Sequence, residues 1–304
     1  MMSRTENISG SYRVATKVKD YFQLIKFTLS FTVVFSCVIC YLMAPGVSYN
    51  LKMVVLLFVA GMLVTASANA INQAVEKDTD AVMKRTGKRP VADGRMSQNE
   101  AYTFAFITGI LGVLMMWQFF NLTAAVLSAF SLFLYAFIYT PLKKVNSIAV
   151  LVGAFPGALP CLIGWVAGFL PDEQILWVGG LILFAIQFLW QFPHFWAIAW
   201  VAHTDYSKAG FKLLPAEKGP TKFTAVQAIM YSVLMIPVGM LPYYFGLAGN
   251  VSLIILIVCN LFMVAQCVRL YFEMDVKAAR RVMFSSYIYL PIVLLALLAD
   301  KVAA

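Results

Sequence analysis

Nine apolar runs divide this chain, and they constrain its fold more than any other feature of the sequence. Each run has about 20 residues, the length that crosses the hydrocarbon core of a bilayer as an α-helix. The runs are too continuous for barrel strands, which alternate apolar and polar residues. With 62% hydrophobic and 12% charged residues, the composition also differs from that of soluble domains. We therefore predict an all-α polytopic membrane protein with nine spans: residues 23–44, 52–75, 99–119, 122–139, 148–170, 174–200, 223–246, 250–272 and 282–299.

The polar segments between the runs are too short to form a soluble domain. We predict a polar N-terminal lead-in over residues 1–22 and a single membrane domain over residues 23–304. Residues 1–22 lack the pattern of a cleavable signal peptide. The five cysteines all fall inside apolar runs and show no zinc-binding spacing, so we interpret them as small buried hydrophobic residues.

The basic residues gather on one side of the predicted membrane. All lysines and arginines except Lys26, Lys52 and Lys301 lie in the lead-in or in the segments that follow spans two, four, six and eight. This bias places the N-terminus and those segments in the cytoplasm, and the C-terminus on the opposite side. The net charge of +9 is thereby explained by membrane orientation, and we predict no nucleic-acid partner. Most acidic residues lie on the same side, although orientation does not require them there.

Residues 69–97 contain the densest group of charges, NAINQAVEKDTDAVMKRTGKRPVADGRMS. Asn72, Glu76 and Asp80 are four residues apart and would share one face if the second helix continued through them. Asp78 adds a carboxylate, and five basic residues follow: Lys84, Arg85, Lys88, Arg89 and Arg95. Clustered oxygen ligands suit Mg²⁺, and clustered cations suit phosphate oxygens. The pattern indicates a metal-bridged diphosphate site, although a solvated charged loop would show a similar pattern.

A second polar group lies at the end of the sixth run. His194 sits within that run, and an ionisable residue inside a span is a functional candidate; the alternative is a histidine hydrogen-bonded between helices. Asp205 supplies a further carboxylate or caps a helix, and His203 lies close to it in sequence. Lys26 either reaches a phosphate or extends to the headgroups. Lys143 and Lys144 either contact phosphate or only satisfy the charge bias across the membrane.

Four stretches resemble sequences of the UbiA-type intramembrane prenyltransferases. Within that superfamily, the chain most resembles the protoheme IX farnesyltransferases, also called haem O synthases. The run from Asn72 to Pro90 is similar to the first signature of the superfamily, and Tyr139-x₃-Lys143-Lys144 is similar to its Tyr-x₃-Lys-Arg element. The segment from Gly157 to Trp165 and the block Gln191-Phe-Pro-His-Phe-Trp196, with Asp205-Tyr206 after it, resemble the haem O synthases. The resemblance covers residues 18–298 in the same order.

This resemblance implies a helix bundle around a central cavity with a polar cytoplasmic cap. It also implies Mg²⁺ as the cofactor, with farnesyl diphosphate and haem b as substrates. The candidate catalytic residues are Asn72, Glu76 and Asp80. The candidate metal ligands are Asn72, Glu76, Asp78, Asp80 and Asp205, the candidate diphosphate-binding residues are Lys26, Arg85, Arg89, Tyr139, Lys143 and Lys144, and the candidate haem-binding residues are His194, Trp196 and His203.

Three positions depart from the family pattern. Glu76 stands where the family usually has Asp, and Ala209 replaces the last Asp of the second Asp-x₃-Asp motif. Thr204 lies where many haem O synthases carry an acid, so a second metal ion at Asp205 is less strongly indicated. Phe27 replaces the proline that usually follows the lysine of the first span.

The resemblance implies transfer of a farnesyl group to a haem vinyl group with addition of water, a step toward haem A, in a bacterial inner membrane. Contact with a haem A synthase or a terminal oxidase is an associated expectation. One alternative is a prenyltransferase acting on an aromatic quinone precursor or a chlorin. An alternative of another class is a membrane transporter, which would need a polar path to the side where the sequence has almost no ionisable residues.

Overall fold

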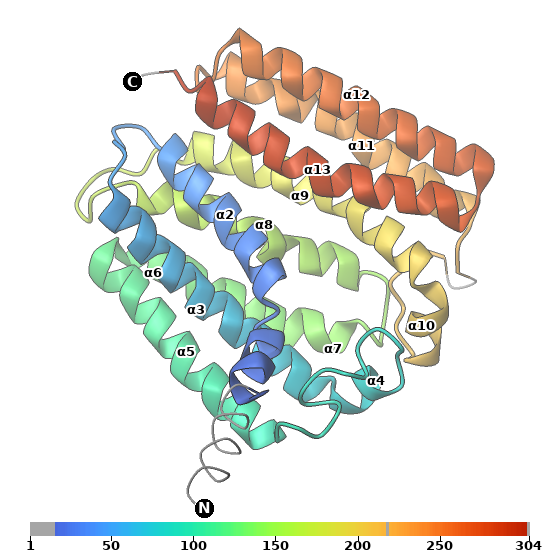
Figure 1. The fold of residues 1–304 in the computed structure, drawn as a ribbon. Coiled ribbons are helices and arrows are strands. Elements are labelled where there is room, and N and C mark those ends of the chain that lie inside the picture. The colour runs from blue at the N-terminus through green and yellow to red at the C-terminus, as the bar shows by residue number, and fades with distance from the viewer. Residues whose placement is uncertain (1–15, 217–218, 303–304) are drawn as a thin grey trace, which may run out of the picture.

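A computed structural model describes residues 16–216 and 219–302, and helices make up most of that part of the chain (Figure 1). Within it, a bridge between Ala248 and Lys301 is the only β pairing. Residues 1–15 of the predicted lead-in, with Arg4 and Arg13, lie outside the described residues. The helices are Thr16–Leu24, α2 (Phe27–Met43), α3 (Leu51–Val75), α4 (Lys77–Ala81), α5 (Gln98–Phe119), α6 (Leu122–Phe133), the π-helix η1 (Leu134–Tyr139), α7 (Thr140–Leu142), α8 (Ala149–Ala167), α9 (Trp177–Val201), α10 (His203–Lys208), α11 (Lys222–Tyr244), α12 (Asn250–Glu273) and α13 (Val276–Ala299).

The number of spans agrees with the multi-pass prediction. Eight of the described helices are long and apolar enough to cross a membrane, and a bent pair makes a ninth if its two parts form one span. That pair, Thr16–Leu24 and Phe27–Met43, bends by 49°. The span predicted over residues 23–44 corresponds to α2 together with the end of the preceding helix. The chain breaks at Lys26, whose φ of 48° is left-handed and ends the regular helix there.

The central helix of the bundle is α8. It packs against α2, α6 and α9, and its apolar segment is the most deeply buried of the candidate spans. In Figure 1, α3, α5 and α6 lie on one side of it and α11, α12 and α13 on the other. Gly164 of α8 lies directly against the backbone of Cys37 in α2, where a larger residue would collide. Small residues allow this close approach of helices in membranes.

Side chains of neighbouring helices donate to backbone carbonyls of α8, which contains two prolines. Pro160 has no N–H to donate to the carbonyl of Pro156, and the hydroxyl of Ser131 donates to that carbonyl instead at 3.3 Å. From α9, the amides of Gln187 and Gln191 donate to the carbonyls of Gly157 and Ala154, at 3.0 Å each. The polar side chains of α9 thus hold α8 in place next to the cavity described below.

At the end of the bundle that holds the C-terminus, Lys301 fastens the last helix to α2. Its Nζ donates to the carbonyls of Leu42 and Ala44 at 2.8 and 2.7 Å, where α2 ends and those carbonyls lack helical partners. We expect Lys301→Met to lower the free energy of unfolding by about 2 kcal/mol, because charge-assisted hydrogen bonds are lost. Thermal unfolding in detergent would measure this, with the exposed Lys52→Met as the matched control. Equal midpoints for the two variants would contradict the prediction.

Candidate active site

Three buried polar residues line up where α3 meets α4. The regular α3 ends at Val75 and a five-residue α4 follows, so the predicted unbroken helix is interrupted at Glu76. The helical hydrogen bonds nevertheless continue across the break, from Glu76 N to Asn72 O at 2.9 Å and from Asp80 N to Glu76 O at 2.7 Å. Asn72, Glu76 and Asp80 are all buried. The expected stacking at four-residue intervals therefore survives the interruption.

Each of these three residues faces a cation from another part of the chain. Lys26 Nζ donates to Asn72 Oδ1 at 2.7 Å. Glu76 Oε1 lies 2.5 Å from Lys143 Nζ, which comes from the start of the α7–α8 loop. Arg89 Nη1 donates to Asp80 Oδ2 at 2.6 Å.

These pairs leave some buried polar atoms without hydrogen-bond partners. Among the residues that the structure describes, Asp80 Oδ1 and Asn72 Nδ2 have none, and Glu76 Oε1 meets Lys143 in an ion pair that lacks hydrogen-bond geometry. A buried carboxylate oxygen without a donor is costly unless a further ligand binds it. Carboxylate and amide oxygens fit a hard divalent cation, and the nearby cations fit an anion that would bridge to it.

The structure does not bring all the predicted metal ligands together. Among residues 16–216 and 219–302, no group of three or more His, Cys, Asp and Glu side chains is placed to hold one metal ion. Asp78 is exposed on α4, and Asp205 is half-buried on α10. Glu76 and Asp80 therefore form a pair of protein carboxylates, and the remaining ligands of a metal ion would come from substrate oxygens or water.

Aromatic side chains contact two cations at this polar site, Lys143 and Arg85. Lys143 Nζ lies over the ring of Tyr139, 4.8 Å from its centroid, and near Phe211 at 5.4 Å. Arg85 Nη2 donates to the hydroxyl of Tyr206 at 3.2 Å, which ties the segment after α4 to α10. These cation–π contacts hold the cations in position without neutralising them. Lys144 is exposed and takes no part in these contacts.

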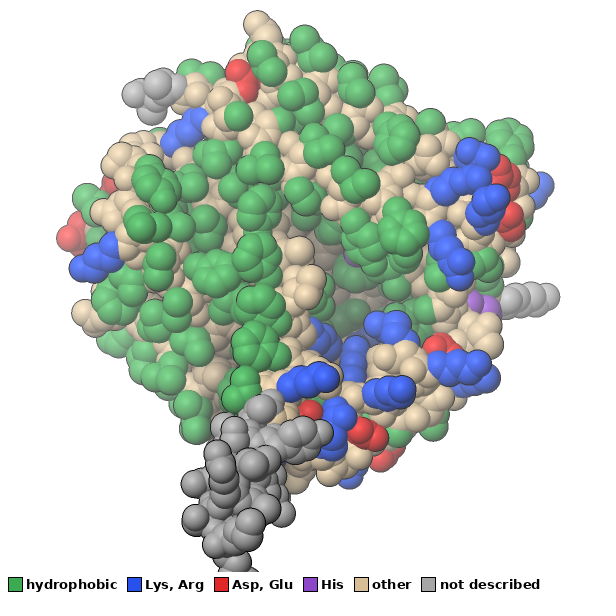
Figure 2. All heavy atoms as spheres, in the orientation of Figure 1, with side chains coloured by type: hydrophobic (Ala, Val, Ile, Leu, Met, Phe, Trp, Pro, Cys, Tyr) green, Lys and Arg blue, Asp and Glu red, His purple; other side chains and the backbone are tan. Residues whose placement is uncertain are grey.

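Below the polar site lies a mostly apolar cavity of about 300 Å³. Figure 2 shows a hollow with apolar side chains at its floor and lysines and arginines along one rim. The lining comes from eight helical segments: α2, α3, α5, α6, η1, α8, α9 and α13. Tyr135 and Tyr139 reach the cavity from the π-helix, a geometry that often marks functional sites.

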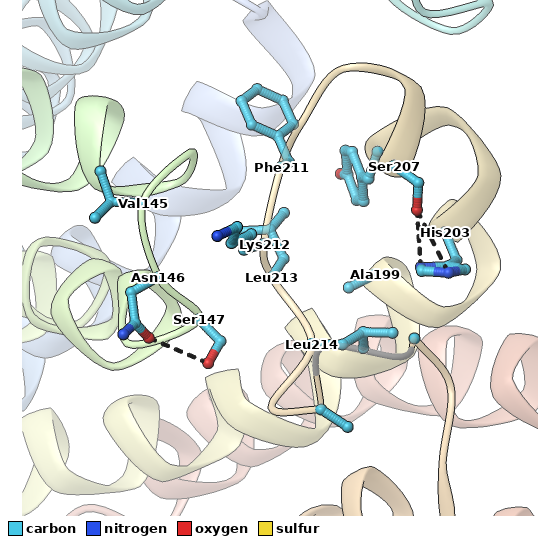
Figure 3. Close-up of a pocket in the computed structure, with 13 residues that line it drawn as sticks. Val145, Asn146, Ser147, Ala199, His203, Ser207, Phe211, Lys212, Leu213 and Leu214 are labelled. Atoms are coloured by element: carbon cyan, nitrogen blue, oxygen red, sulfur yellow. Dashed lines mark hydrogen bonds between the residues drawn. The ribbon is translucent and has the colours of Figure 1, made fainter.

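Only one of the three candidate haem-binding residues lines this cavity. His194 does so, stacked on Trp190 with ring centroids 4.6 Å apart. Trp196 packs in the core against Phe192 and Tyr231 and is not among the lining residues. His203 lies in a separate pocket of about 280 Å³, which shares no lining residue with the cavity. In Figure 3, Asn146 and Ser147 lie across that pocket from His203 and Ser207.

Sequence reasoning did not single out several residues that the structure places at the cavity. Tyr135, Gln187 and Trp190 line it, and so does Tyr287 of α13. Gln187 and Gln191 are four residues apart in the sixth run, a spacing that places them on one helix face with His194 close by. A polar stripe on an otherwise apolar span is a signal that would have identified the two glutamines.

Comparison with known proteins places this architecture in a family. The model of the UbiA prenyltransferase family matches residues 33–288. The chain belongs to that family. It is 44% identical to the protoheme IX farnesyltransferase of Cytophaga hutchinsonii over 95% of this chain and all of that protein. It is 39% identical to the protoheme IX farnesyltransferase of Flavobacterium psychrophilum, covering 93% of this chain and 94% of that one.

Solved structures of the UbiA family share the fold. A digeranylgeranylglyceryl phosphate synthase superposes with a TM-score of 0.77 at 24% identity, covering 94% of this chain and 98% of that one. A UbiA homologue from Archaeoglobus fulgidus bound to GPP and Mg²⁺ superposes with a TM-score of 0.60 at 14% identity, covering 92% and 99%. At these identities the likeness establishes the fold, including the multi-pass helical bundle.

Proposed function

We propose that this chain is a prenyltransferase that farnesylates haem b to haem O. The proposal rests on an apolar cavity next to a buried site of paired acids and cations, which are linked by Tyr139: this residue lines the cavity and its ring contacts Lys143. A prenyl diphosphate has the same polarity pattern, an apolar chain attached to a charged head. The relatives named protoheme IX farnesyltransferase, at up to 44% identity over nearly the whole chain, support haem b as the acceptor.

The diphosphate would lie at the polar end of the cavity. Lys26 donates to the neutral amide of Asn72, while Arg89 and Lys143 pair with Asp80 and Glu76. A bound diphosphate offers these three cations stronger acceptors. Arg85 and Tyr139 stand beside them, and Lys144 remains a weaker candidate at the rim. The carboxylates of Glu76 and Asp80, with the amide oxygen of Asn72, would then hold Mg²⁺. When bound, Mg²⁺ takes up negative charge on the departing diphosphate.

Farnesyl transfer consumes farnesyl diphosphate, haem b and water, and it releases diphosphate and a proton. The bond between the farnesyl C1 and the diphosphate oxygen breaks, and the diphosphate leaves with the electron pair. The terminal carbon of a haem vinyl group bonds to C1, and water adds to the other vinyl carbon with loss of a proton. The product is a hydroxyethylfarnesyl haem. Lys26, Arg89 and Lys143 stabilise the charge that develops on the leaving group.

The apolar lining protects the allylic cation from water until the vinyl group reacts. Tyr135, Tyr139 and Trp190 place aromatic rings along the cavity, where their faces can stabilise positive charge. His194 is the residue we propose to bind the haem, because it lines the cavity. Its position within a span and at the cavity favours a metal-containing tetrapyrrole over a quinone precursor, and the names of the relatives favour haem over a chlorin.

In the cell, we propose that the chain lies in a bacterial inner membrane with the polar site facing the cytoplasm and the C-terminus on the opposite side. The charge bias of the loops supports this orientation. Contact with a haem A synthase or a terminal oxidase is a further part of the proposal, because a product as hydrophobic as haem O is best passed on within the membrane.

Mass spectrometry tests the reaction directly. Purified protein in detergent, given haem b, farnesyl diphosphate and Mg²⁺, is expected to form the hydroxyethylfarnesyl adduct, and chelation of the metal is expected to abolish the product. His194→Ala is expected to lower haem turnover at least about tenfold, a loss of about 1.4 kcal/mol in transition-state stabilisation. Diphosphate release with an aromatic acceptor, without any haem product, would support the prenyltransferase class and contradict haem as the acceptor.

A further inference from the structure

Ser286 of α13 makes hydrogen bonds to two cavity-lining aromatic residues of α9. Its hydroxyl Oγ lies 2.8 Å from His194 Nδ1, and its backbone carbonyl accepts from Trp190 Nε1 at 2.9 Å. Trp190 and His194 are themselves stacked with an interplanar angle of 20°. Ser286 is fully buried. One residue of α13 therefore fixes the position of both rings.

The hydrogen bonds of Ser286 determine which nitrogen of His194 carries the proton. A serine hydroxyl has a single proton to donate. Ser286 Oγ donates it to the carbonyl of Met283, which lies 2.6 Å away in the preceding turn of α13. Two acceptor oxygens at that distance without a proton between them would repel each other. The hydroxyl must therefore accept from His194, so Nδ1 carries the hydrogen.

The second nitrogen of His194 is then an unprotonated acceptor. Within the described part of the chain, the hydrogen bond of the His194 ring uses Nδ1, which leaves Nε2 without a protein partner. A neutral imidazole with its Nδ1–H bonded to a neighbour presents the Nε2 lone pair outward. His194 lines the cavity, and Nε2 is the ring nitrogen that Ser286 does not engage.

We propose that Ser286 is a positioning residue that holds His194 in the Nδ1–H tautomer, so that Nε2 binds the metal of a planar metalloporphyrin in the cavity. This inference rests on the proposed function, because haem b is the substrate it invokes. A hydrogen-bond partner on the far nitrogen of a ligating histidine fixes its ring orientation and raises its basicity. The stacked Trp190 restricts the ring further, because the same residue anchors both.

The tautomer can be measured directly, because the chain has only two histidines. In a His203→Gln background, His194 is the sole histidine, and its two ¹⁵N resonances in the reconstituted protein report which nitrogen is protonated. We expect protonation at Nδ1. In Ser286→Ala we expect a shift toward protonation at Nε2. A wild-type His194 protonated at Nε2 would overturn the proposal without any measurement of activity.

Porphyrin binding tests the consequence. Zinc protoporphyrin IX and metal-free protoporphyrin IX are titrated into the full-length protein. We expect Ser286→Ala to weaken zinc protoporphyrin binding about tenfold and to leave metal-free protoporphyrin binding unchanged, because the hydrogen-bond partner of a metal-binding histidine typically contributes about 10- to 100-fold in metal affinity. Ser286→Thr, which keeps the hydroxyl, is expected to restore both the tautomer and the affinity. Equal loss for both porphyrins, or no loss for either, would overturn the proposal.

Ser232→Ala is the matched control. Ser232 is equally buried, and its hydroxyl contacts Cys267 between α11 and α12, outside the cavity lining. Ser232→Ala is expected to leave both titrations unchanged.

Failure of the proposed function gives a different pattern from failure of this inference. In that case zinc protoporphyrin binding would depend on Ser286, but haem b would give no farnesylated product. Product formation at the wild-type rate in a folded Ser286→Ala, with an unchanged tautomer, would reject the role of Ser286 and retain the reaction.

Discussion

Asp80→Asn is expected to lower kcat for farnesyl transfer at least about 100-fold, the loss typical when one group that stabilises transition-state charge is removed. Asp80 is buried, one of its oxygens binds Arg89, and the other has no hydrogen-bond partner in the described part of the chain. Asparagine has nearly the same shape but no charge, so it weakens the binding of a divalent cation while disturbing the packing little. The measurement is product formed per minute at saturating farnesyl diphosphate and Mg²⁺.

Asp93→Asn is the matched control for this variant. Asp93 lies in the same segment after α4, but it is exposed and paired with Arg95 at 2.9 Å. Its loss is expected to leave kcat unchanged. Asp78→Asn is informative as well, because the exposed position of Asp78 predicts a smaller effect than that of Asp80. If Asp80→Asn kept more than a tenth of the wild-type rate, Asp80 would have no direct role in diphosphate departure.

Lys143→Met is expected to destabilise the protein by about 3 kcal/mol, because it leaves the carboxylate of Glu76 buried without its partner. The two groups are 2.5 Å apart and both are buried. The same change removes a cation from the diphosphate site, so activity should fall as well. Thermal unfolding in detergent and product assays measure the two effects separately.

The double variant Glu76→Gln/Lys143→Met distinguishes stability from function. It removes both buried charges, so most of the lost stability should return, since replacing a whole buried ion pair is often nearly neutral. Activity should stay low, because neither the metal ligand nor the cation is present. The neighbouring Lys144→Met is the stability control, expected to change the free energy of unfolding by less than about 0.5 kcal/mol. A double variant as unstable as Lys143→Met would show that the ion pair is not the source of the effect.

The break at Lys26 and the π-helix at η1 could not be read from the sequence. Lys26 adopts a left-handed conformation, and its amine meets Asn72 on another helix. Nothing in the local sequence specifies either fact, because hydropathy is the same for a straight and a bent span. The π-helix over Leu134–Tyr139 likewise lies inside a run whose composition suits an ordinary helix. Both positions contact distant segments, because Lys26 binds Asn72 and η1 packs against α8.

The sequence alone determined that the chain forms a bundle of membrane helices, that its charges gather on one side, and that Asn72, Glu76 and Asp80 share a helix face. Length, hydropathy and four-residue spacing fix these properties, because each depends only on residues near one another in the chain. The tertiary structure decided which cation meets which acid, that His194 but not Trp196 or His203 lines the cavity, and that Ser286 bonds to His194. Those pairings join residues as many as 92 positions apart, and only the packing of the helices brings them together.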